Sequence, residues 1–237
     1  MICKIADLIA EVPAAGGMAP RCRDYLTDET LTPEVVISEA SYRPERYPGA
    51  DYDLVCYMES GRNFYGNLVR HSGIMLHASA VEWEGKAYLF SGPCTVGKST
   101  HTGLWQSLYG EKAQVFNDDK PALRYLDGTW FAYGTPWCGK DGINQNKKVP
   151  LGGICFLSQA TENRMRRLSS REAVVRLMSQ TMHRFVQAED AQKLLHLLDK
   201  LISLVPVYEL ENRPDLDAAR LSSTTMGSGT TEAPKGG

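Results

Sequence analysis

Residues 86–101 read KAYLFSGPCTVGKSTH, and this stretch decides how the rest of the chain is interpreted. The apolar run Ala87–Phe90 predicts a buried strand, and a helical pattern begins near Lys98. Between them, residues 92–99 match the pattern GxxxxGK[ST] at every fixed position. An ordinary glycine-rich turn could carry the same letters. The strand before the loop and the helix after it favour a phosphate-binding loop.

The chemistry of phosphate binding explains the spacing within this loop. Gly92 and Gly97 allow backbone N–H groups to turn inward around phosphates, and the positive end of the following helix points at them. Lys98 is expected to reach the β- and γ-phosphates, and Ser99 to offer its hydroxyl to Mg²⁺. We therefore expect ATP or a similar nucleoside triphosphate, with Mg²⁺. The expected nucleotide contacts are Gly92, Pro93, Cys94, Thr95, Val96, Gly97, Lys98, Ser99 and Thr100.

Two adjacent carboxylates, Asp118 and Asp119, end a short predicted strand downstream of the loop. In an α/β fold such a strand end lies beside the phosphate loop, so one carboxylate could bind Mg²⁺ while the other takes a proton from an attacking hydroxyl. The sequence leaves open which does which. Asn-Asp-Asp is also good turn chemistry, so a solvated turn is the alternative. His77, on the apolar stretch before the loop, is more often a packed core residue when taken alone, and His101 lies in the first turn after the loop.

Three regions are expected along the chain. Residues 1–70 are rich in Gly and Pro and predict a small strand-rich lobe, with strands over Glu34–Ser38 and Asp53–Met58. Residues 71–221 predict the α/β domain that carries the loop. Residues 222–237 are of low complexity, rich in Ser, Thr and Gly, and predict disorder.

Within the second region, apolar patterns, a hairpin dipeptide at Asp127-Gly128 and a capping box at Ser169 and Glu172 predict most elements. The expected strands are Ile74–Val81, Lys86–Phe90, Gln114–Phe116, Ala122–Leu126, Trp130–Tyr133, Leu151–Leu157 and Val205–Leu210, and the expected helices are Lys98–Tyr109, Arg171–Met182, Glu189–Leu204 and Pro214–Leu221.

Composition argues against several classes of partner and site. The formal net charge of -2 gives no electrostatic footprint for nucleic acid or anionic lipid. The six cysteines form no CxxC pair, which argues against a zinc or thioredoxin-like site. No apolar run is long enough for a membrane span or a secretory signal. We expect a cytoplasmic protein, and the sequence leaves a homo-oligomer open.

The string LHASAVEWEGKAYLFSGPCTVGKSTHT, followed by VFNDDKPAL, resembles the C-terminal catalytic domain of the HPr kinase/phosphorylase family. That family shares its nucleotide-binding core with the ATP-dependent phosphoenolpyruvate carboxykinases, so the resemblance implies a carboxykinase-like P-loop fold with a mixed sheet and flanking helices. It also implies that His77 is an active-site histidine, that Lys98 contacts phosphate, that Ser99 binds magnesium, and that Asp118 or Asp119 supplies the general base. The second metal carboxylate of the family has no clear counterpart; the loop of residues 134–148 occupies that region, with Thr135, Lys140 and Asp141 as candidates for substrate contact.

The leading hypothesis is a kinase that moves the γ-phosphoryl group of ATP to a hydroxyl, with serine of a peptide, a protein or a small molecule as the acceptor. The first alternative is a nucleotide-binding regulatory module that transfers nothing, which would suit the missing carboxylate. The second is a carboxykinase-like lyase acting on a keto acid, for which the sequence offers no further metal clamp.

Overall fold

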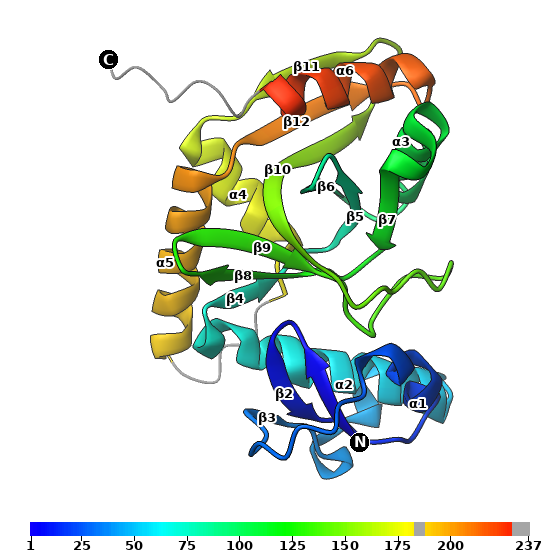
Figure 1. The fold of residues 1–237 in the computed structure, drawn as a ribbon, viewed down its shortest axis with the longest axis vertical. Helices are drawn as coiled ribbons and strands as arrows, with labels where there is room; N and C mark the ends of the chain where they lie inside the picture. Colours follow the sequence, from blue (N-terminus) through cyan, green and yellow to red (C-terminus); the bar gives the residue numbers. More distant parts are fainter. Residues whose placement is uncertain (183–187, 229–237) are drawn as a thin grey trace.

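The centre of the fold is a mixed, curled sheet flanked by helices (Figure 1). The computed structural model describes residues 1–182 and 188–228, and within these the sheet has nine strands. The main order is β4-β8-β9-β10-β6-β5-β7, and β12 and then β11 branch from β10. The bounds are β4 (Gly73–Met75), β5 (Ala78–Trp83), β6 (Lys86–Ser91), β7 (Ala113–Asn117), β8 (Ala122–Leu126), β9 (Thr129–Tyr133), β10 (Lys148–Gln159), β11 (Arg164–Arg167) and β12 (Val207–Asn212).

The long strand β10 joins the two halves of the sheet because it changes partners along its length. Its first residues pair antiparallel with β9, and its middle pairs parallel with β6. Its last residues pair parallel with β12. The apolar run Leu151–Leu157 predicted a central strand, and this prediction is confirmed.

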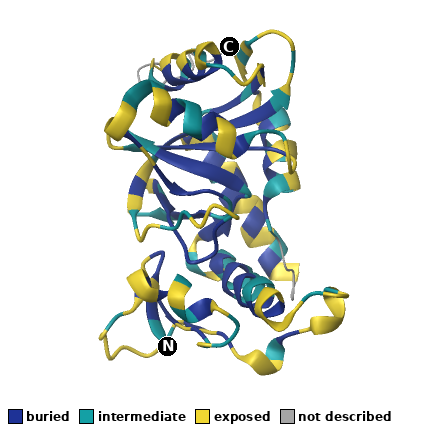
Figure 2. Ribbon diagram, turned by 90° about the vertical axis from the view of Figure 1, so that its right-hand side faces the viewer, coloured by how far each residue is buried: buried dark blue, intermediate teal, exposed yellow. Residues whose placement is uncertain are grey.

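Helices cover both faces of the sheet, which makes its central strands buried on both sides. Alternate residues of a strand point to opposite faces, so Leu89 of β6 lies in one hydrophobic core and Phe90 in another. The first core lies under α4 (Ser170–Gln180) and α5 (Ala188–Leu204), and the second under α3 (Lys98–Tyr109) and α6 (Leu216–Ser228). Figure 2 shows the buried residues concentrated in the sheet and the exposed ones on the outer sides of the helices and on the loops. Every described helix is too short or too polar to span a lipid bilayer.

The N-terminal region has strands, but mostly not where the sequence predicted them. A small sheet of β1 (Ile2–Ile5), β2 (Leu8–Glu11) and β3 (Val35–Val36) packs with α1 (Met18–Arg21) and α2 (Tyr52–Leu68). The strand predicted over Asp53–Met58 is wrong, because these residues form the start of the 17-residue helix α2. Asp51 caps this helix by accepting a hydrogen bond of 2.8 Å from the backbone N–H of Leu54.

Two further predictions need correction. The strand expected over Ile74–Val81 breaks into β4 and β5, because Leu76 and His77 lie outside both ladders. The disorder expected from residue 222 onward is wrong for residues 222–228, which complete α6. Ser222 and Met226 are fully buried there, and Ser222 Oγ lies 2.9 Å from both His101 Nε2 and Trp105 Nε1. Residues 229–237 lie outside the described residues.

The loop between β9 and β10 anchors the N-terminal region to the sheet through Trp137. Its indole is fully buried, stacks on Phe64 with ring centroids 5.0 Å apart, and donates a hydrogen bond of 3.0 Å to Ser60 Oγ. A Cβ atom added at Gly61 would lie 2.9 Å from the indole, so the close approach requires glycine. The helix α2 and the β9–β10 loop therefore form one packed unit.

The buried end of α6 predicts that Met226 contributes to stability. Met226→Ala should lower the free energy of unfolding by about 2–5 kcal/mol through lost burial and a residual cavity. Thr224→Ala, at an exposed position two residues earlier, should change it by less than about 0.5 kcal/mol. Urea unfolding of the two variants provides the comparison; equal stabilities would mean that this segment does not pack as described.

Candidate functional site

Three chain segments that the sequence singled out meet at one edge of the sheet. Strand β5 lies antiparallel between β6 and β7, so β6 and β7 run parallel to each other and end at the same edge. The glycine-rich loop follows β6, the pair Asp118-Asp119 follows β7, and His77 immediately precedes β5. The ladder between β5 and β6 pairs Ala78 with Ser91, which places His77 beside the start of the loop.

The glycine-rich loop turns sharply between β6 and α3. Gly92 and Gly97 have φ of 143° and 103°, a conformation that L side chains rarely adopt. Gly97 is the N-cap of α3, and no side chain of the described residues caps this helix, so its first N–H groups are open to a ligand. Lys98 is buried, and its Nζ donates to the carbonyl oxygens of Gly92 and Pro93, each at 3.1 Å.

Charges around the loop act on Lys98. Burial lowers the pKa of Lys98 below its ordinary value, while the negative charge of Asp119 acts in the opposite direction. Ser99 and Thr100 are exposed in the first turn of α3. His101 instead turns inward to α6, where burial lowers its pKa to about 4, so it does not face the loop.

Asp119 is the most densely connected carboxylate of the site. Its Oδ1 accepts a hydrogen bond of 3.1 Å from His77 Nε2, and its Oδ2 forms an ion pair with Lys120. Burial opposes the charged form, but His77 and Lys120 together hold the pKa of Asp119 at about 2. Burial also disfavours the charge of Lys120, yet Tyr57 and Asp119 hold its pKa above the ordinary value. Asp119 is thus ionised over the physiological range.

His77 is fixed in position from two directions. Its Nδ1 lies 3.1 Å from the side-chain oxygen of Gln180 at the end of α4, and its backbone N–H donates to the Gln180 carbonyl at 2.9 Å. Ser91, the last residue of β6, donates from its hydroxyl to the His77 carbonyl oxygen at 2.8 Å. The ionised Asp119 carboxylate can only accept a hydrogen bond, so Nε2 of His77 is the donor. The side-chain amide of Gln180 has both a donor and an acceptor, so it can pair with Nδ1 of His77 whether or not Nδ1 carries a proton.

Asp118 has a different environment from its neighbour. It is only 4% exposed, and its Oδ1 accepts a hydrogen bond of 2.6 Å from the backbone N–H of Gly139. Burial raises the pKa of Asp118 above its ordinary value. A Cβ atom added at Gly139 would lie 2.8 Å from Asp118 Oδ2, so a side chain there would displace the carboxylate. Asp118 therefore ties the β9–β10 loop to the end of β7.

The turn that carries both carboxylates is shaped by Asn117. Its Oδ1 accepts from the backbone N–H groups of Asp119 at 3.2 Å and Lys120 at 2.7 Å, as in an Asx turn. Asn117 itself is fully buried, and its amide donates to the carbonyl oxygens of Thr135 and Trp137. The turn chemistry expected from the sequence is present, but the turn is a packed part of the site and not a solvated one.

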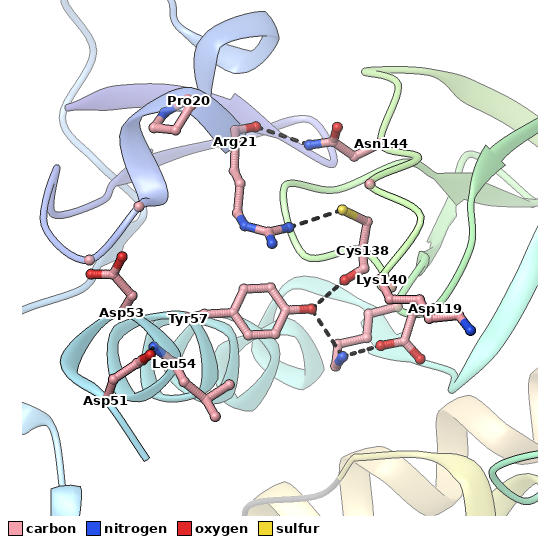
Figure 3. Close-up of a pocket in the computed structure, with 15 residues that line it drawn as sticks. Pro20, Arg21, Asp51, Asp53, Leu54, Tyr57, Asp119, Cys138, Lys140 and Asn144 are labelled. Carbon is pink, nitrogen blue, oxygen red and sulfur yellow. Dashed lines mark hydrogen bonds and ion pairs between the residues drawn. The ribbon is translucent and has the colours of Figure 1, made fainter.

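A cleft of about 850 Å³ opens beside Asp119 (Figure 3). Its walls come from α1, the first turns of α2, the β9–β10 loop and the pair Asp119-Lys120. Lys140, one of the loop candidates, lines the cleft, whereas Asp141 does not, and Thr135 is fully buried in hydrogen bonds to Tyr65 and Lys120.

Sequence reasoning missed Lys120, Gln180 and Tyr57. Lys120 follows the aspartates directly, so its proximity was available from the sequence, but its ion pair was not. Gln180 and Tyr57 are 103 and 63 residues from their partners His77 and Lys120, and no local pattern signals such contacts.

The donor groups of the site are sparse for a preformed metal centre. Within residues 1–182 and 188–228, no group of three or more His, Cys, Asp and Glu side chains is arranged to hold a metal ion. The oxygen donors expected for Mg²⁺ are the Ser99 hydroxyl and the two carboxylates. Mg²⁺ commonly binds one or two carboxylates and completes its shell with water and substrate phosphates, so this set fits the ion.

The fold and site define a mixed α/β protein with a glycine-rich strand–loop–helix beside a carboxylate–histidine–lysine cluster. Within this class, the family model of the SynChlorMet cassette protein ScmC matches residues 48–212, and the chain belongs to that family. The matching family is thus ScmC and not the HPr kinases. No curated protein matches the sequence.

One solved structure similar to this chain is described as "Structure of the Hpr(Ser) kinase/phosphatase from Coxiella burnetii". The TM-score is 0.38 with 11% sequence identity, covering 65% of this chain and 89% of that chain. This is a distant structural likeness, and a TM-score of this size does not establish a shared activity.

The ion pairs of Asp119 predict a specific pH dependence of stability. The folded pKa of about 2 lies below the ordinary 3.8, so the stabilisation is present above the ordinary value and is lost as the pH falls toward 2. Asp119→Asn lacks this contribution. The difference in unfolding free energy between the wild type and Asp119→Asn should therefore shrink by about 1 kcal/mol between about pH 5 and about pH 3.

Urea unfolding at the two pH values measures this difference. Asp141→Asn, at an exposed position on the neighbouring loop, is the control and should follow the wild type at both pH values. A difference for Asp119→Asn that does not change with pH would contradict the proposed ion pairing.

Proposed function

We propose that this protein is a phosphotransferase that moves the γ-phosphoryl group of ATP, with Mg²⁺, to a hydroxyl group. The observation that carries the proposal is the meeting of the loop after β6 with Asp119 and His77 at one edge of the sheet. A phosphate donor and a hydroxyl acceptor must meet at such a place, between a cradle of N–H groups and a carboxylate.

The loop supplies the binding groups for the donor. The uncapped N–H groups at the start of α3 and the helix dipole favour a polyphosphate there. The Lys98 ammonium group donates to the carbonyl oxygens of Gly92 and Pro93. It can donate to phosphate oxygens in their place when a nucleotide binds. Ser99 and one of the two carboxylates would hold Mg²⁺, which neutralises charge on the phosphate oxygens when bound.

Asp119 is the better candidate for contact with the acceptor, because it lines the cleft while Asp118 is held by Gly139. Transfer forms a bond between the acceptor oxygen and the γ-phosphorus, and breaks the bond between that phosphorus and the leaving oxygen of ADP. The hydroxyl proton passes to the Asp119 carboxylate. Since such transition states are loose, the carboxylate chiefly needs to accept a hydrogen bond and orient the hydroxyl.

One observation favours a second candidate, a nucleotide-binding module that transfers nothing. The pairing with His77 and Lys120 keeps the pKa of Asp119 at about 2, which makes it a weak base in this arrangement. Such a module would bind Mg²⁺ and ATP through the same loop and leave every hydroxyl compound unlabelled. Incubation with γ-labelled ATP and hydroxyl acceptors separates the two functions.

Lys98→Met should lower transfer by about 100-fold or more, because the only lysine of the loop would be lost from the charge developing on the phosphoryl group. Lys112→Met, which removes an exposed lysine just beyond the same helix, is the matched control and should retain transfer. Steady-state labelling with γ-labelled ATP measures both. Full transfer by the Lys98 variant would rule out the assigned role of the loop.

Asp119→Asn should lower kcat with little change in the affinity for ATP, since the amide keeps the shape but loses the acceptor charge. Asp141→Asn should leave kcat unchanged, because Asp141 does not line the cleft. Rates of label transfer together with equilibrium ATP binding provide the test. Equal kcat for Asp119→Asn and the wild type would remove Asp119 from the reaction.

A further inference from the structure

The cleft beside Asp119 is built jointly by the N-terminal region and the α/β domain. Figure 3 shows Asp51 and Asp53 at one end, Asp119 and Lys140 at the other, and the Tyr57 ring between them. The cleft therefore leads from the start of α2 to the carboxylate assigned above to the acceptor hydroxyl.

The middle of the cleft is formed by Tyr57 and the contacts that hold it in place. Tyr57 Oη donates to the Cys138 carbonyl oxygen at 2.6 Å and accepts from Lys120 Nζ at 3.1 Å. The Arg21 guanidinium lies over the Tyr57 ring, 4.8 Å from its centroid, and donates to Cys138 Sγ at 3.1 Å. These contacts connect α1, α2, the β9–β10 loop and the turn after β7, so both walls keep their positions without a ligand.

The open side and the glycine-lined walls of the cleft suit an extended chain. Its volume of about 850 Å³ lies toward the upper end of the range for small-molecule sites, about 300–1,000 Å³, and the cleft is open to solvent along one side. Glycines occur on both walls, Gly16 and Gly17 on one and Gly139 and Gly142 on the other, so no side chain projects into the cleft at these positions. The N–H groups of Gly139 and Gly142 are already bonded, to Asp118 Oδ1 at 2.6 Å and to the Gly139 carbonyl oxygen at 3.2 Å, so the glycines provide width for the main chain of a ligand and not free hydrogen-bonding groups.

The charges of the cleft are separated along its length. Lys120 is paired with Asp119, and Figure 3 shows Lys140 at the same end of the cleft. Arg21 lies over Tyr57 in the middle, and Asp51 and Asp53 lie at the far end. Both of these aspartates are exposed, and within residues 1–182 and 188–228 neither forms an ion pair. One oxygen of Asp51 is used to cap α2. The far end therefore offers a carboxylate, chiefly that of Asp53, to a positive group on a ligand.

We propose that this cleft binds the phosphate acceptor and that the acceptor is an extended peptide segment, with its hydroxyl at Asp119 and a basic residue at Asp51 and Asp53. This inference rests on the proposed phosphotransfer for the direction of the peptide. The N-terminal region thereby determines which acceptor the site receives.

The test measures peptide binding without transfer. Fluorescein-labelled serine peptides carrying Lys, Ala or Glu at matched positions are titrated with the full chain in the presence of Mg²⁺ and a non-hydrolysable ATP analogue, and binding is read by fluorescence anisotropy. The wild type should bind the Lys peptides about two- to fivefold more tightly than the Glu peptides, as expected for one exposed ion pair. Asp53→Lys should reverse this order.

Asp141→Lys is the matched control, since it reverses a charge outside the cleft lining and should keep the wild-type order. Circular dichroism and thermal unfolding confirm that each variant is folded; Asp53 is exposed, so its replacement should cost little stability. An unchanged order in Asp53→Lys, or no binding of any peptide, overturns the inference.

The outcomes also separate this inference from the proposed function. A reversed order with no labelling of any peptide would support the cleft and contradict phosphotransfer. Labelling of a small hydroxyl compound by a protein that binds no peptide would support phosphotransfer and overturn the peptide cleft.

Discussion

The site depends on the antiparallel position of β5 between β6 and β7. Because β5 is hydrogen-bonded to both neighbours in the opposite direction, the ends of β6 and β7 lie at one edge, with the start of β5 between them. The loop, the aspartates and His77 are separated in sequence but fixed together by these ladders. Two further contacts refine the arrangement: Ser91 holds the His77 carbonyl, and the backbone N–H of Ala78 donates to the Asp119 carbonyl at 3.0 Å.

The sequence predicted those parts of the fold whose signals are local. The helix Lys98–Tyr109 and the hairpin around Asp127-Gly128 are confirmed, as is the capping box in which Ser169 and Glu172 bond reciprocally at the start of α4. In each case the deciding residues lie within a few positions of one another. The candidate residues of the site were found in the same way, since the loop pattern and the aspartate pair are contiguous, but their contacts come from the sheet order.

The errors occurred where burial does not follow hydropathy. The buried side of α2 includes Glu59, Ser60 and Gly61, so its apolar residues alone resembled a strand. The end of α6 is rich in Ser and Thr, yet the Ser222 hydroxyl is satisfied by His101 and Trp105, and a polar segment is buried at little cost. Pairings such as that of Tyr57 with Lys120 depend on tertiary structure, and the cleft that they support has no sequence signature.

The packing of Trp137 against α2 has a consequence for how the chain can be divided. The match to the ScmC family begins at residue 48, just ahead of α2. This helix provides Phe64, on which the Trp137 indole stacks, and one wall of the cleft. Dividing the chain at residue 70 would separate Trp137 from its partners on α2. Each fragment would then expose a large aromatic surface and part of its hydrophobic core to water. Evolutionary exchange of modules at that point would therefore be selected against.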